Sequence, residues 1–149
     1  MARQRIVITG IGGLCALGTN AADIWNAMKA GKVGIGEMMH SPIHDLKNRI
    51  GAEIRELPEH GLDRKRLITM DRFSLLAIIA AKEAISQAGV EVTPANAGRI
   101  GTVIGTGIFG GDSVEENYRA LLRDGKARAN VFTVPRIMPS APTGQVSME

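Results

Sequence analysis

Apolar residues recur with a helical period through the middle of the chain. Between residues 70 and 88 they follow the i, i+3, i+4, i+7 spacing that places side chains on one face of a helix. Leu75, Ile78 and Ile79 add apolar surface on a second side, a distribution typical of a buried helix. Gly89 follows as a C-terminal cap. The pattern therefore predicts a buried helix over 70–88.

Short β-branched runs predict strands before and after this helix. Residues 5–10 and 99–105 are apolar runs that end in glycine, as buried parallel strands do ahead of tight turns. Residues 50–54 are a further candidate, within a stretch from 32 to 68 that has no clean period. Strands that alternate with helices favour an α/β fold.

Capping signals predict further helices on both sides of the central one. Asn20 can cap a helix that Gly31 ends, with Asp23 three residues after the cap. Ser113 and Glu116 have the spacing of a capping box for a helix that follows the second strand. We therefore expect strand, turn and helix to succeed one another twice.

Prolines divide the remaining segments. Residues 93–96 are expected to form a short helical turn, because Pro94 suits the first position of a helix. Residues 131–149 carry prolines at 135, 139 and 142, and a last helix is expected to begin at Gly144.

Composition restricts the class of protein. A chain of 149 residues with 44% hydrophobic residues can bury the core of one ordinary domain. Aromatic residues make up only 3% and the net charge is +3, so no nucleic-acid partner is expected. The single Cys excludes an internal disulfide and fits a cytoplasmic location. No apolar run is long enough for a signal peptide or a membrane span.

The glycine turns that follow the expected strands invite a comparison with dinucleotide sites. The first turn fails the G-x-G-x-x-G pattern at its third glycine, where Cys15 stands. The second turn matches at Gly105, Gly107 and Gly110. Acidic residues from Asp112 onward begin the following helix, where they would repel a pyrophosphate. Glycines that allow close backbone approach are the alternative interpretation.

The residues with metal-binding or nucleophilic side chains are few. His40 and His44 have the spacing of metal ligands on a helix, but Pro42 between them disfavours a helix, and His60 is distant. We therefore expect no metal site. Cys15 has apolar neighbours, so it is interpreted as a small buried hydrophobe rather than a nucleophile.

Four segments together resemble the β-ketoacyl synthases along the whole chain. RIVITGIGGLCALG and the Trp25-bearing helix resemble that family's first strand and turn, and MDRFSLLAIIAAKEAISQAGV resembles its buried helix. RIGTVIGTGIFGGDSVEENY resembles its second strand and the turn at the dimer interface, where Ile108 is closer to the type II synthases. VPRIMPSAPTGQVSM resembles the segment that leads to the nucleophile.

This resemblance implies an α/β, thiolase-like fold with layers in the order αβαβα. The family condenses an acyl thioester with malonyl-acyl carrier protein, in fatty-acid or polyketide synthesis. It works as a homodimer with acyl carrier protein as partner and needs no redox cofactor. Residues 1–149 would be the N-terminal part of such a domain and an incomplete half of its fold.

The resemblance also implies roles for particular residues, although no catalytic one. Gly107 and Ile108 match positions that line the family's acyl pocket. A second group matches a segment that reaches toward the pocket of the partner subunit: Thr133, Val134 and Met138. A third lies where the family docks acidic acyl carrier protein, although a solvated approach to the central helix would explain it equally well: Arg64, Lys65 and Arg66.

The nucleophilic cysteine of the family would lie beyond Glu149, and its histidines further on. The 149-residue chain is therefore expected to be inactive alone and marginally stable. The alternatives are a non-catalytic chain-length factor, a nucleotide-binding reductase and an oligomerisation module.

Overall fold

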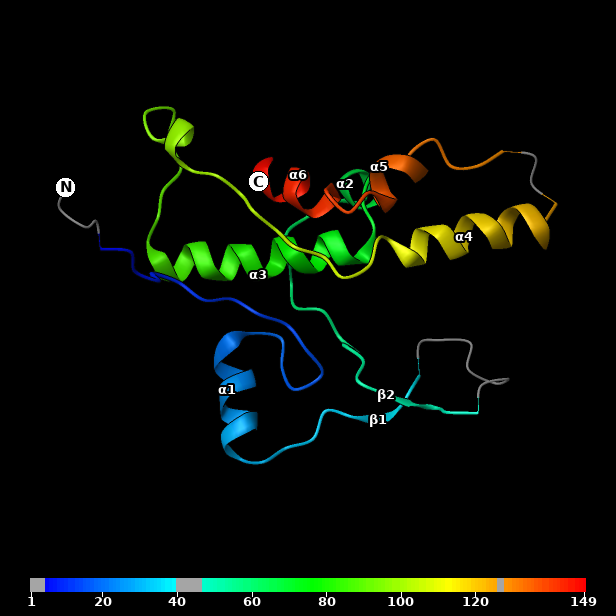
Figure 1. Ribbon diagram of the computed structural model, residues 1–149, viewed down its shortest axis with the longest axis horizontal. Helices are drawn as coiled ribbons and strands as arrows, with labels where there is room; N and C mark the ends of the chain where they lie inside the picture. Colours follow the sequence, from blue (N-terminus) through cyan, green and yellow to red (C-terminus); the bar gives the residue numbers. More distant parts are fainter. Residues whose placement is uncertain (1–4, 40–46, 126–127) are drawn as a thin grey trace. The chain divides into compact units, whose positions relative to one another are not determined.

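The computed structural model describes residues 5–39, 47–125 and 128–149. The chain divides into two compact units. Unit 1 comprises Met1–His60 and Ile79–Glu91, and unit 2 comprises Gly61–Ile78 and Val92–Glu149. The long helix α3 (Arg72–Ala88) therefore contributes its first part to unit 2 and its second part to unit 1 (Figure 1).

Helix α3 confirms the prediction from apolar periodicity. Its first part is buried, because Ser74, Leu75 and Ile78 are at most 9% exposed. Arg72 at its start is exposed, and Ile85 in the second part is 42% exposed, so the helix is not buried on all sides. Gly89 ends the helix with φ of 62°, the left-handed conformation that glycine adopts without strain.

Unit 1 contains α1 (Ala21–Lys29) and a short antiparallel pair of strands, β1 (Gly36–Glu37) and β2 (Ile50–Gly51). Helix α1 begins as predicted, because Asn20 Oδ1 accepts a hydrogen bond from Asp23 N at 2.8 Å. The candidate strand over 50–54 is confirmed only at its first residues, which pair with β1 in the register Glu37 opposite Ile50.

Unit 2 contains the remaining helices. These are α2 (Arg64–Ile68), the 3₁₀ helix η1 (Ala97–Arg99), α4 (Gly111–Leu122), α5 (Thr133–Ile137) and α6 (Ala141–Ser147). Helix α5 packs against both α4 and α6. The predicted turn over 93–96 runs directly into η1, while the last helix begins three residues before Gly144. Helix α5 was not predicted from the sequence.

The predictions of buried strands over 5–10 and 99–105 are wrong for this chain. Ile6 and Ile8 are 94% and 83% exposed, and Val103 is 98% exposed. A strand requires hydrogen bonds to a neighbouring strand, and the described residues form only the β1–β2 ladder and one isolated bridge. Apolar runs of this composition therefore remain unpaired here.

Candidate functional site

The residues predicted to line an acyl pocket all lie in unit 2. Gly107 and Ile108 belong to the glycine turn before α4, and Ile108 is 73% exposed. Thr133 and Val134 begin α5, and Met138 caps its end. Val134 and Met138 are also well exposed, so these apolar side chains face away from the core of their own unit.

A hydrogen bond joins the end of the glycine turn to the end of α5. Gly110 N donates to Ile137 O at 3.3 Å, and a β-carbon on Gly110 would lie only 2.7 Å from Arg136 O. Arg136 in turn pairs with Glu116 of α4 at 3.1 Å. Unit 2 therefore brings together the two segments that carry the predicted acyl-site residues. Of this turn's glycines, Gly110 is the one whose close contacts leave no room for a side chain.

The first turn of α4 is capped by a distant buried carboxylate. Asp71 is 3% exposed, and its Oδ2 accepts a hydrogen bond from Ser113 N at 2.7 Å. The predicted capping box is wrong, because α4 begins at Gly111 and Ser113 lies inside its first turn. Asp71 also lies at the start of α3, where its backbone oxygen accepts from Ser74 N at 3.1 Å. Its position before an apolar run is the signal that could have identified it.

A second carboxylate on α3 holds the first glycine turn in the same way. Glu83 Oε2 accepts from Gly13 N at 2.9 Å, and Glu83 Oε1 accepts from Ala21 N, at the start of α1, at 2.8 Å. A β-carbon on Gly12 would collide with the backbone oxygen of Ala80. These contacts favour close backbone approach as the role of the first turn. A phosphate would have to displace Glu83 to reach these amides.

The basic run forms helix α2. Asp63 caps this helix, because its Oδ1 accepts from Arg66 N at 2.8 Å. Arg66 also forms an ion pair with Glu149 at 2.8 Å. Arg64 and Lys65 are exposed. Arg66 therefore differs from the two cations before it, because it forms an ion pair within unit 2 while they are exposed.

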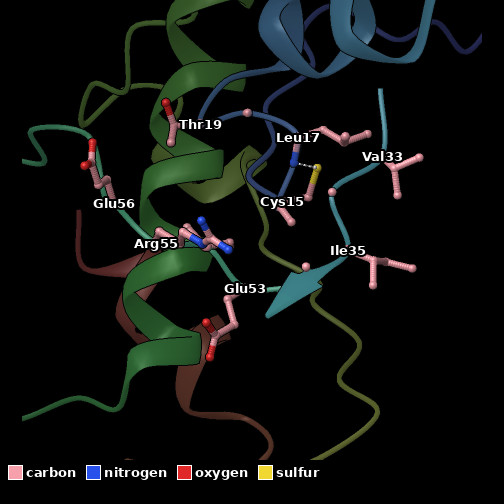
Figure 2. A pocket seen from close by; sticks show the side chains of 13 residues that line it. Cys15, Leu17, Thr19, Val33, Ile35, Glu53, Arg55 and Glu56 are labelled. Carbon is pink, nitrogen blue, oxygen red and sulfur yellow. Dashed lines mark hydrogen bonds between the residues drawn. The ribbon is translucent and has the colours of Figure 1, made fainter. Parts of the chain in front are cut away.

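Cys15 lines a pocket of about 430 Å³ in unit 1. Figure 2 shows Val33 and Ile35 on one side of Cys15 and Arg55 on the other. The Sγ atom of Cys15 accepts a hydrogen bond from Leu17 N at 3.4 Å. Cys15 is half-buried, so its interpretation as a small buried hydrophobe is confirmed only in part.

The structure brings no metal ligands together in the part that it describes. No group of three or more His, Cys, Asp or Glu side chains there could hold a metal ion. His40 and His44 lie outside the described residues. The backbone oxygen of His60 accepts a hydrogen bond from Lys82 Nζ at 3.3 Å.

Comparison with known families shows the family to which the chain belongs. Residues 3–149 match the model of the β-ketoacyl synthase N-terminal domain. The chain belongs to the β-ketoacyl synthase family. This match covers both glycine turns and the whole of α3, the same segments whose geometry is described above.

Curated relatives of this ketoacyl synthase chain carry two names. Nodulation protein E of Rhizobium sp. (strain N33) is 55% identical over 97% of this chain. The 3-oxoacyl-[acyl-carrier-protein] synthase 2 of Coxiella burnetii is 35% identical over 100% of this chain. The chain spans 36% of the length of each of these relatives.

Solved ketosynthase structures share the fold. A β-ketoacyl synthase from Burkholderia phymatum STM815 superposes with a TM-score of 0.77 at 25% identity, over 98% of this chain and 36% of that one. The ishigamide ketosynthase/chain length factor gives 0.81 at 20% identity, over 99% of this chain and 37% of that one. The fold of this chain is therefore that of a ketosynthase N-terminal segment, and its described secondary structure consists of helices and one two-stranded sheet. Among its described helices, none has the length and apolar character required to cross a bilayer.

Proposed function

We propose that the protein containing this chain is a decarboxylating β-ketoacyl-acyl-carrier-protein synthase of fatty-acid or polyketide biosynthesis. The observation that carries the proposal is the family match over residues 3–149. It is supported by 35% identity to a 3-oxoacyl-[acyl-carrier-protein] synthase over the entire chain. Internal carboxylates occupy the turn amides that a nucleotide-binding reductase would need, so the geometry favours condensation over that alternative.

The proposed reaction proceeds by nucleophilic catalysis. A cysteine thiolate attacks the acyl thioester and the carrier thiol leaves. Malonyl-acyl carrier protein then loses CO₂, and the electron pair left on carbon attacks the acyl-cysteine thioester, which releases the cysteine. We place that cysteine and the histidines that assist decarboxylation outside this chain, because Cys15 lies in the first glycine turn and does not match the position of the family's nucleophile.

Within such a protein, residues 1–149 would form the N-terminal part of a layered αβαβα domain. The apolar side chains of Ile6, Ile8 and Val103 are more than 80% exposed here and would be buried by further strands of the sheet. We also propose a cytoplasmic homodimer, in which Gly107 and Ile108 line one acyl pocket. Thr133, Val134 and Met138 would reach toward the pocket of the partner subunit.

A condensation assay on the complete gene product tests the proposal. Incubation with an acyl-acyl carrier protein and malonyl-acyl carrier protein should yield CO₂ and a 3-oxoacyl product, detected by mass spectrometry. The 149-residue chain by itself should yield neither. A complete protein that is folded but forms no product would exclude the enzyme and favour the chain-length-factor alternative.

We further propose that Arg64 and Lys65 contribute to docking of acyl carrier protein. Both are exposed, and they lie side by side in the sequence at the start of α2. Arg66 forms an ion pair with Glu149, and the negative charge of that carboxylate weakens the attraction of Arg66 for an acidic partner. Complementary charge at the edge of an interface acts mainly on the rate of association.

Reversing both exposed charges should weaken carrier-protein binding without impairing the chemistry. We expect Arg64→Glu with Lys65→Glu to raise the KM for acyl-acyl carrier protein by roughly tenfold at low salt, with kcat nearly unchanged. The matched control is Lys47→Glu with Arg99→Glu, which makes the same net charge change at other exposed positions. Equal KM values for the two double variants would count against docking at α2.

A further inference from the structure

Asn117 on α4 contacts the start of α5 through the oxygen of its amide group, while the amide nitrogen bonds within α4. Its side chain is 9% exposed on α4. The Nδ2 group donates to Ser113 O, one turn earlier in the same helix, at 2.7 Å. The Oδ1 atom accepts from Asn130 N at 3.0 Å. It also lies 3.0 Å from Thr133 Oγ1, whose single hydrogen is shared with Asn130 O at 2.6 Å. The donor contact sets the orientation of the amide, so its oxygen faces the residues that begin α5.

Helix α5, whose start Asn117 contacts, is too short to be stable without tertiary contacts. Helix α5 has five residues, too few for an isolated helix to be stable. Its N-cap residue Phe132 has no side-chain capping bond, and Asn130 Oδ1 accepts from Phe132 N at 2.9 Å to close the preceding turn. Contacts with neighbouring segments must therefore supply the position of α5, and α4 provides side-chain contacts among them.

Those contacts lie at both ends of α5. At its end, Arg136 pairs with Glu116 at 3.1 Å, and that arginine side chain is only 13% exposed. At its start, Asn117 provides the contact from α4. Val134, one residue after the threonine bound by Asn117, is 63% exposed. Loss of the Asn117 side chain would therefore let Val134 move, while the ion pair of Arg136 with Glu116 still holds the other end of α5.

We propose that Asn117 is a positioning residue that sets the preference for acyl-chain length by holding Thr133 and Val134 in place. The inference rests on the proposed function, in which these residues approach an acyl pocket. If the side chain of Val134 shifts, the pocket gains or loses contacts with methylene groups of the bound acyl chain. Such contacts discriminate between substrates that differ by a few methylene groups.

The test measures kcat/KM of the complete gene product for a short and a long acyl-acyl carrier protein. We expect Asn117→Ala to change the ratio of these values by roughly tenfold. Thr133→Val removes the hydroxyl at constant shape and should change the ratio in the same direction, whereas Thr133→Ser should restore it. The double variant Asn117→Ala with Thr133→Val should change the ratio by less than the two single changes combined, because both remove the contact between Asn117 and Thr133.

Glu115→Ala is the control on the same helix. Glu115 is exposed and pairs with Arg119, so its removal should leave the ratio unchanged. A general loss of stability lowers both values together and does not move their ratio. If Asn117→Ala does not fold, Asn117→Gln provides the comparison, because it keeps the amide group and moves its oxygen by the length of one methylene group.

Two results would overturn the inference, and they are distinguishable. An active wild type whose ratio is unchanged in the folded Asn117→Ala and Thr133→Val variants would overturn the positioning role and leave the proposed function intact. A folded wild type that does not condense either substrate would overturn both.

Discussion

Replacing Asp71 with alanine should lower the free energy of unfolding by about 2 kcal/mol, because the capped amide of Ser113 would be left buried without a partner. The carboxylate is 3% exposed, and its Oδ2 accepts from Ser113 N at 2.7 Å. Alanine supplies no acceptor, and solvent has little access to replace it. Urea unfolding of the complete gene product, followed by circular dichroism, measures the loss.

Matched variants separate the buried contact from the general effect of charge. Asp112→Ala removes an exposed carboxylate from the first turn of the same helix and should cost only about 0.5 kcal/mol. Asp71→Asn keeps an acceptor oxygen and should fall between the two alanine variants. If Asp71→Ala and Asp112→Ala lost equal stability, the capping role of Asp71 would be wrong.

Gly12→Ala should destabilise the protein by about 2 kcal/mol, because an added methyl group that forces backbone to shift costs 1–3 kcal/mol. The new β-carbon would collide with the backbone oxygen of Ala80 in α3. Backbone of a helix cannot yield as a flexible side chain can, so the turn itself would have to move. The shift would also strain the hydrogen bond of Gly13 N to Glu83. A thermal or urea melt of the complete gene product detects the loss.

Gly101→Ala is the control for this prediction. No described atom lies within 4 Å of the β-carbon that it would add. Its stability should stay equal to wild type or rise by up to about 1 kcal/mol, because alanine restricts the unfolded chain more than glycine does. Similar melting of the Gly12 and Gly101 variants would contradict close approach of the first turn to α3.

The family assignment and much of the acyl-site proposal could be reached from the sequence, because they depend on motifs that run along the chain. The positions of Gly107, Ile108 and Val134 relative to other residues could not. Val134 lies on α5, a helix of five residues that begins at Thr133 and contains Pro135, so its sequence has no helical period to detect. The position of Val134 depends on Asn117, a residue that no pattern in the sequence distinguishes.

The sequence itself determined the longest helix and several helix ends. The span of α3, the cap at Asn20 and the left-handed glycine at position 89 were all predicted and found. Helix hydrogen bonds join residues four apart, and caps join residues three apart. The information that specifies them is therefore present in any short window of the chain.

Only the tertiary structure decided the strands, the capping of α4 and the partner of the first glycine turn. The runs over 5–10 and 99–105 have the composition of strands, yet a strand forms only where a neighbour supplies hydrogen bonds. The amide of Ser113 is satisfied by a carboxylate 42 residues away, and that of Gly13 by one 70 residues away. No local pattern specifies partners at such separations, because they meet only when the chain has folded.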